Sequence, residues 1–154
     1  MTALELMAAC RRNNQEKARL EAQIEELEDA ITCVSAFGGE GGRKSVSDRY
    51  AAYVARKDEL TRRLKKTKRA LAAEAAAVIL LTDTLPATQR KSARGFYCYG
   101  KPIGEIAEEM HYSVSSIAKA LAAVRAAARL IGEDEVREKL PAWYWKAYGR
   151  EQPI

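Results

Sequence analysis

Two long stretches of the chain place an apolar residue alternately every four and every three positions, which is typical of amphipathic helices that pair along a seam. The first stretch runs from Thr2 to Val34 and the second from Ser45 to about Thr82. The seam positions of the first are Leu6, Cys10, Asn13, Lys17, Leu20, Ile24, Leu27, Ile31 and Val34. Those of the second are Tyr50, Tyr53, Lys57, Leu60, Leu64, Thr67, Leu71, Val78 and Leu81. Asn13 and Lys17 either fix the register of the pair or mark a part of the first helix that faces solvent.

The segment between the two stretches, residues 37–44, reads FGGEGGRK and predicts a connector between helices. Four basic and seven acidic side chains lie in residues 1–35, whereas eleven basic and four acidic ones lie in residues 36–71. We therefore expect an antiparallel helical hairpin over residues 1–84, in which an acidic helix lies beside a basic one. The alternative is that the two seams pair between copies of the chain and form a homodimer.

The second stretch ends at Leu85-Pro86, because proline cannot continue a helix. A shorter helix is expected from about Ala87 to Tyr99, where Gly100 ends it. Its residues expected in the core or half-buried are Ala93, Phe96, Tyr97 and Tyr99.

Residues 101–131 predict two helices joined by a short turn. The apolar positions are Ile103, Ile106, Ala107 and Met110 on the first helix, and Ile117, Leu121, Val124 and Leu130 on the second. Ser113 is a good N-cap for the second helix, and the small Ala107 lets the two helices pack closely. This pattern predicts a helix-turn-helix domain over residues 85–132, whose second helix would enter the major groove of DNA.

Several residues of this region resemble region 4 of bacterial sigma factors. They are Leu85-Pro86, Gln89-Arg90, Tyr99-Gly100, Ile103 to Met110 (IGEIAEEM), Ser113 and Ile117. The motif covers residues 85–131, and the whole chain is similar to small phage and prophage transcription regulators of the ArpU-like kind. The resemblance implies an activator that binds promoter DNA, and not a complete sigma factor, because no promoter-melting region precedes the motif.

The helix-turn-helix pattern also predicts which side chains contact DNA. The early, exposed positions of the second helix are expected to reach base edges, and they are Val114, Ser115, Ser116 and Lys119. The residues expected to contact phosphates are Arg90, Lys91, Arg94, Lys101, Ser113, Arg125 and Arg129, with Ser92 interpreted as another helix start. Alanines stand at positions 118, 120, 122 and 123, where sigma-factor helices carry more polar residues. These alanines favour weak recognition of DNA bases, or a helix-turn-helix that serves for contact with another protein.

The last segment, residues 133–154, is expected to form a short helix and an aromatic tail. Gly132 is interpreted as the C-cap of the preceding helix. An acidic helix is expected from Glu133 to Leu140, where Pro141 stops it. Both tryptophans lie in the Trp143-Tyr144-Trp145 cluster, which either packs back on the body or binds a partner. Residues 151–154 are expected to fray.

Composition narrows the class of protein. The net charge of +5 and the pI near 9.2 suit a nucleic-acid partner, and the Ala-, Leu-, Glu-, Lys- and Arg-rich composition favours an all-α fold. Three separated cysteines and a single histidine give no zinc-site spacing, and no catalytic motif is present. We therefore expect neither an enzyme nor a bound cofactor or metal. Without a signal peptide or a membrane-length apolar run, a cytoplasmic location is expected.

Three functions fit these patterns. The first is a phage- or prophage-type transcription regulator that binds double-stranded DNA and contacts RNA polymerase, a sigma factor or a second copy through the hairpin. The second is a DNA-packaging adaptor like a terminase small subunit, in which the DNA-binding part usually comes first. The third is a helical interaction protein that mimics region 4 without touching DNA.

Overall fold

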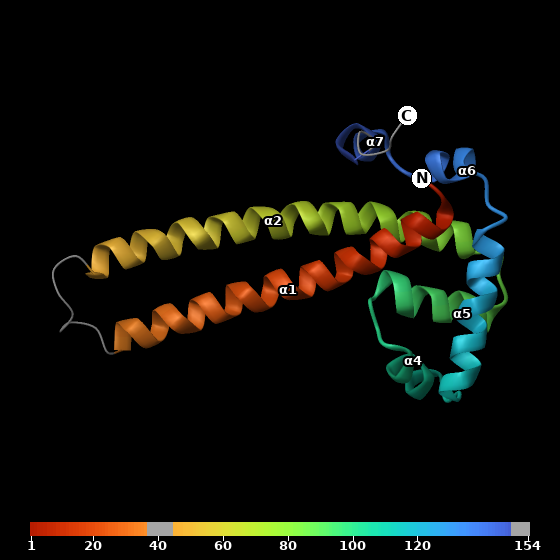
Figure 1. Cartoon of the computed structure of the whole chain (residues 1–154), viewed down its shortest axis with the longest axis horizontal. Coiled ribbons are helices and arrows are strands. Elements are labelled where there is room, and N and C mark those ends of the chain that lie inside the picture. The colour runs from red at the N-terminus through yellow and green to blue at the C-terminus, as the bar shows by residue number, and fades with distance from the viewer. Residues whose placement is uncertain (37–44, 149–154) are drawn as a thin grey trace. The chain divides into compact units, whose positions relative to one another are not determined.

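The computed structural model describes residues 1–36 and 45–148, and all regular secondary structure in these ranges is helical. The elements are α1 (Ala3–Ala36), α2 (Ser45–Thr82), α3 (Ala87–Ala93), the π-helix η1 (Arg94–Cys98), α4 (Ile103–Met110), α5 (Val114–Ala128), α6 (Glu133–Lys139) and α7 (Ala142–Tyr148) (Figure 1). The all-α prediction is confirmed. The expected glycine-rich connector at 37–44 and the expected fraying of 151–154 lie outside the described residues.

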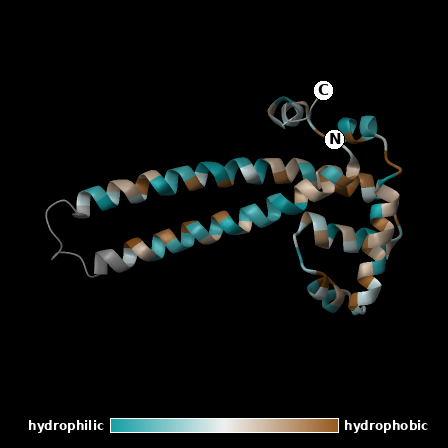
Figure 2. Cartoon of the chain, in the orientation of Figure 1, coloured by the Kyte–Doolittle hydropathy of each residue, from teal (hydrophilic) through white to brown (hydrophobic). Residues whose placement is uncertain are grey.

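The chain divides into two compact units that do not follow the expected boundary after residue 84. Unit 1 contains Met1–Gln15 and Arg69–Ile154, and unit 2 contains Glu16–Lys68. The first turns of α1 and the last turns of α2 therefore belong with the elements that follow Pro86. Figure 2 shows hydrophobic residues gathered in these parts of α1 and α2, while the rest of both helices is more hydrophilic.

Unit 2 consists of the remaining parts of α1 and α2. Ion pairs join the two helices at Glu28–Lys57 (3.0 Å), Glu21–Lys68 (3.8 Å) and Glu16–Arg63 (3.5 Å). Leu20 and Leu60 are fully buried on the seam. The ion pairs are exposed to solvent, which screens the attraction between their charges, so the apolar seam stabilises the unit more.

Tyr50 is 60% exposed, so its expected place on the seam is wrong. Tyr53, one turn later, is half-buried and its ring centroid lies 6.0 Å from that of Tyr50. The described seam of α2 therefore begins at Tyr53, and Tyr50 lies outside it.

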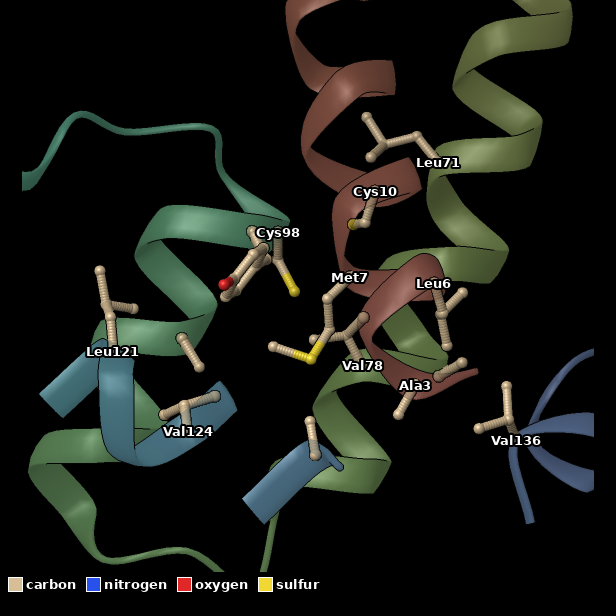
Figure 3. Close-up of a cluster of buried hydrophobic side chains, with 14 of the residues drawn as sticks. Ala3, Leu6, Met7, Cys10, Leu71, Val78, Cys98, Leu121, Val124 and Val136 are labelled. Atoms are coloured by element: carbon tan, nitrogen blue, oxygen red, sulfur yellow. The ribbon is translucent and has the colours of Figure 1, made fainter. Parts of the chain in front are cut away.

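Unit 1 has one hydrophobic core to which most of its helices contribute (Figure 3). Its buried side chains include Ala3, Leu6, Met7 and Cys10 of α1, Leu71 and Val78 of α2, Tyr97 and Cys98 of η1, Leu121 and Val124 of α5, and Val136 and Tyr144 of α6 and α7. Trp143 and Trp145 are half-buried against this core, and the Arg69 guanidinium lies 4.1 Å from the centre of the Trp143 ring. The aromatic cluster thus packs back on its own unit, the first of the two interpretations.

A carboxylate lies buried on the seam of α2. Glu74 follows Leu71 by three residues and precedes Val78 by four, and its side chain is fully buried. Asn13 of α1 donates a hydrogen bond from Nδ2 to Glu74 Oε1, whereas Oε2 has no hydrogen-bond partner in the described structure. Burial raises the pKa of Glu74 from 4.5 to about 7, although Asn13, Tyr144 and Arg12 act in the opposite direction. The contact favours the register-fixing interpretation of Asn13.

Two expectations about the end of α5 are wrong. Leu130 was expected on the apolar face, but α5 ends at Ala128 and Leu130 is 88% exposed. Because Leu130 lies after the end of the helix, the helical period does not place it on the same face as Ile117, Leu121 and Val124. Gly132 is not a C-cap, because it has φ −72° and ψ 152° and stands at the N-cap of α6. The C-cap of α5 is Arg129, which has right-handed backbone angles, so no left-handed residue ends this helix.

Candidate nucleic-acid interface

A three-residue turn, residues 111–113, joins α4 to α5. His111 ends α4 in the left-handed conformation, with φ 58° and ψ 38°, and the backbone N–H of Tyr112 donates to the Ala107 carbonyl at 2.9 Å. Ser113 then caps α5, because its Oγ accepts a hydrogen bond from the backbone N–H of Ser116 at 3.1 Å. The N-cap prediction for Ser113 is confirmed.

The two faces of α5 differ as the apolar spacing predicts. Ile117, Leu121 and Val124 are almost completely buried, and α5 packs against α3 and α4. On the other side, the four residues expected to reach base edges are all exposed: Val114, Ser115, Ser116 and Lys119. The first two turns of α5 therefore present one hydrophobic side chain, two hydroxyls and one cation to solvent.

The four exposed side chains are not equally free to contact a ligand. Ser116 Oγ lies 2.8 Å from Ser113 Oγ, so both hydroxyls are already engaged at the cap. Val114, Ser115 and Lys119 make no side-chain hydrogen bond or ion pair within the described ranges. Lys119 is thus the strongest unengaged donor on this surface.

The expected phosphate-contacting residues fall into separate groups. Lys91, Arg94 and Lys101 line one hollow of about 660 Å³ together with Tyr99 and Tyr112. Arg90 is half-buried and donates to the Leu85 carbonyl at 3.5 Å. Arg125 lies in the last turn of α5 and Arg129 is its C-cap, about 18 and 24 Å along the helix from Ser113 at about 1.5 Å per residue. The structure therefore brings three of these cations together and leaves the others apart.

Two sequence interpretations in this region are wrong. Ser92 was interpreted as a helix start, yet it is completely buried near the end of α3 and its hydroxyl donates to the Thr88 carbonyl at 2.7 Å. Tyr99 was expected in the core or half-buried but is 66% exposed. It follows the end of η1, where the change from α- to π-helix alters the angle at which side chains leave the backbone.

Side chains of α1 hold the turn that leads into α4. Arg11 Nη1 donates to the carbonyls of Phe96 (2.7 Å) and Lys101 (3.2 Å). Asn14 Nδ2 donates to the carbonyls of Tyr97 (3.0 Å) and Cys98 (2.9 Å). The carbonyls of Phe96, Tyr97 and Cys98 lie at the end of η1, where carbonyls lack partners within the helix, and that of Lys101 lies in the segment before α4. Sequence reasoning missed both residues, since no local pattern links positions so far apart.

Two buried thiols lie in the core near this turn. Cys10 of α1 and Cys98 of η1 are both buried (Figure 3). The hydrogen bond with Cys98, together with burial, raises the pKa of the Cys10 thiol far above its ordinary value. Cys10 therefore stays protonated and acts as a core side chain.

Within residues 1–36 and 45–148, no group of three or more His, Cys, Asp or Glu side chains has the arrangement of a metal site. None of the described helices is both long and apolar enough to cross a membrane. No protein-family model, curated protein or solved structure matches the chain.

Proposed function

We propose that this protein is a sequence-specific DNA-binding transcription regulator of the phage and prophage type. Its α4–turn–α5 segment acts as a helix-turn-helix, with α5 in the major groove and α4 across the backbone. The proposal places Val114, Ser115, Ser116 and Lys119 at base edges.

The proposal rests on the difference between the buried and the exposed face of α5. One face is buried through Ile117, Leu121 and Val124, so the domain holds the helix rigidly. The opposite face begins at a capped N-terminus and carries Lys119, which has no hydrogen-bond or ion-pair partner among the described residues. A rigid helix whose first turns are exposed is what insertion into the major groove requires.

In this proposal, residues 1–84 form a helical hairpin that contacts RNA polymerase, a sigma factor or a second copy of the chain. Two ion pairs within unit 2 support an antiparallel course, because Glu28 pairs with Lys57 whereas the earlier Glu21 pairs with the later Lys68. A groove of about 380 Å³ in unit 2 is lined by Leu27, Ile31 and Tyr53, and it offers an apolar surface for such a partner.

Selection of bound duplexes from a random DNA pool at about 0.15 M salt tests the proposal. An enriched motif is expected. Lys119→Ala should then weaken binding to the best site by roughly 1–3 kcal/mol and relax specificity at one position. The matched control is Lys139→Ala, because Lys139 is an exposed lysine at the end of α6. Absence of any enriched motif, or equal effects of the two variants, would contradict sequence-specific binding by α5.

A second candidate function, a helical interaction protein that mimics region 4, is favoured by one observation. Besides Lys119, the exposed face of α5 carries three alanines at intervals of four residues, Ala118, Ala122 and Ala126. Small side chains let another helix approach closely but cannot read bases. In this case the protein retains no duplex from the pool, and Lys119→Ala leaves its activity unchanged.

A further inference from the structure

The hollow beside α4 gathers cations from three different elements. Lys91 comes from α3, Arg94 from η1 and Lys101 from the segment after Gly100. The hollow has a volume of about 660 Å³, and Gly95, Ile106 and Met110 also line it. None of the four residues assigned to base contacts lines it. The hollow and the set of residues assigned to base contacts therefore have no residue in common.

Two of these cations have unused hydrogen-bonding capacity. Arg94 Nε is buried and has no hydrogen-bond partner within residues 1–36 and 45–148, and Nη2 of the same guanidinium lies 3.4 Å from Asp83 Oδ1. Lys91 is exposed and makes no ion pair or hydrogen bond in the part of the chain that the structure describes. Three cations thus line the hollow, whereas Glu109 is the single carboxylate in its described lining, so the hollow carries a net positive charge.

The third cation is occupied by an internal anion. Both carboxylate oxygens of Glu109 lie within hydrogen-bond distance of Lys101 Nζ, at 2.9 and 2.8 Å. This contact raises the pKa of Lys101 above its ordinary value. Glu109 therefore takes the place at Lys101 that a bound anion would take.

Two tyrosines border the hollow. Tyr99 is 66% and Tyr112 49% exposed. Their rings offer flat apolar surfaces on which a nucleobase can stack. Cations next to exposed aromatic rings match the chemistry of a nucleotide, with its phosphate and its base.

We propose that the hollow lined by Lys91, Arg94 and Lys101 binds a nucleotide phosphate, with Tyr99 or Tyr112 against the adjoining base. The phosphate comes either from a free nucleotide or from the backbone of DNA bound to α5. A phosphate offers acceptor oxygens in several directions, which suits donors from three elements better than a planar carboxylate does. The proposal does not rest on base reading by α5.

The sharpest test compares two carboxylates of the same helix. Glu109→Gln removes the anion on Lys101, whereas Glu108→Gln makes the same change in net charge at an exposed position outside the hollow. The probes are GMP and inorganic phosphate, measured by calorimetry, and a 20-base-pair duplex, measured by fluorescence anisotropy. We expect Glu109→Gln to tighten binding about five- to tenfold and Glu108→Gln to change it less than about twofold.

A second pair of variants tests the opposite sign. Lys91→Gln is expected to weaken binding about five- to tenfold, and Lys139→Gln, with the same change in charge outside the hollow, is expected to have little effect. Tyr99→Ala together with Tyr112→Ala should weaken the binding of GMP but not of inorganic phosphate. Circular dichroism confirms that each variant is folded.

The outcomes separate the two sources of the phosphate. Tightened GMP binding by Glu109→Gln assigns the hollow to a free nucleotide, and a change confined to the duplex assigns it to the DNA backbone. Equal effects of Glu109→Gln and Glu108→Gln on every probe, or no binding of any probe, overturn the proposal. Duplex binding that depends on Lys119 but on none of the hollow residues leaves the proposed function standing and removes this site.

Discussion

The guanidinium carbon of Arg11 in α1 lies over the ring of Phe96, 3.6 Å from the ring centre, and Arg11 Nη1 donates to the carbonyl of the same residue at 2.7 Å. One side chain thus makes a cation–π contact and a charge-assisted hydrogen bond with a residue 85 positions later. The pair fixes the end of η1 and, with it, the segment that leads into α4. The start of α1, up to Gln15, therefore belongs to the candidate DNA-binding unit.

Arg11→Ala is expected to lower the free energy of unfolding by about 2–3 kcal/mol, because it removes the ring contact and leaves two part-buried carbonyls without their donor. Urea unfolding followed by circular dichroism measures the change. Arg62→Ala, at an exposed position of α2, is the control and should change stability by less than about 0.5 kcal/mol. Similar losses in both variants would show that the Arg11–Phe96 contact contributes little.

Substitution of two glycines should change stability in opposite directions. Gly100 has φ +67°, and a Cβ there would lie 2.9 Å from Asn14 Cβ, so Gly100→Ala is expected to cost about 2 kcal/mol or more. Gly104 lies in the first turn of α4 with open space around it, so Gly104→Ala should stabilise the protein by about 0.5–1 kcal/mol. Thermal unfolding of the two variants compares them directly. A stable Gly100→Ala variant would mean that this turn adapts to a side chain.

The buried Glu74 predicts a loss of stability as the pH rises. Its pKa is about 7 in the folded protein and near 4.5 in the unfolded chain. Below pH 4.5 the carboxyl is protonated in both states and costs nothing, whereas above pH 7 it is ionised in both and the folded state bears the cost of the buried charge. The expected loss between these limits is on the order of 3 kcal/mol.

Glu74→Gln tests this prediction, because glutamine keeps an acceptor for Asn13 but cannot ionise. The variant should be more stable than the natural protein at pH 8, and its stability should fall less between pH 5 and pH 8. Urea unfolding at pH 5, 6, 7 and 8 gives the comparison, with the exposed Glu138→Gln as control. Parallel pH profiles for the natural protein and Glu74→Gln would show that Glu74 does not ionise with this pKa.

The cap of α5 gives a local prediction. Ser113→Ala removes the hydroxyl that accepts from the Ser116 N–H, so it should lower the free energy of unfolding by about 1 kcal/mol. Ser115→Ala is the control, because the Ser115 hydroxyl makes no hydrogen bond within the described residues. Chemical denaturation measures both variants. An equal and small effect at the two positions would contradict a stabilising cap.

Local patterns predicted most of the helices. Apolar spacing gave both long helices within a few residues, Pro86 ended α2, and Ser113 marked the start of α5. The spacing also separated Ile117, Leu121 and Val124 from the exposed Lys119. These features depend on backbone propensity, capping and the helical period, which neighbouring residues determine.

The errors arose where a helix departs from the ideal period or ends. The π-helix at residues 94–98 turned Tyr99 outward, and the end of α5 at Ala128 left Leu130 exposed. Gly95 lies within the π-helix, but a single glycine does not predict one, and neither glycine nor proline stands at Ala128. Packing against neighbouring elements decided both, so they could not be predicted from the local sequence.

By itself, the sequence determined that the described chain is helical, where most of its helices begin and end, and which face of α5 is apolar. Only the tertiary structure decided that Arg11 and Asn14 hold the turn before α4, that Glu74 is buried against Asn13, and that Lys91, Arg94 and Lys101 line one hollow. The physical reason is the range of the interactions. Helix formation and capping depend on residues within about four positions of each other, whereas burial and charge clustering depend on which distant segments pack together.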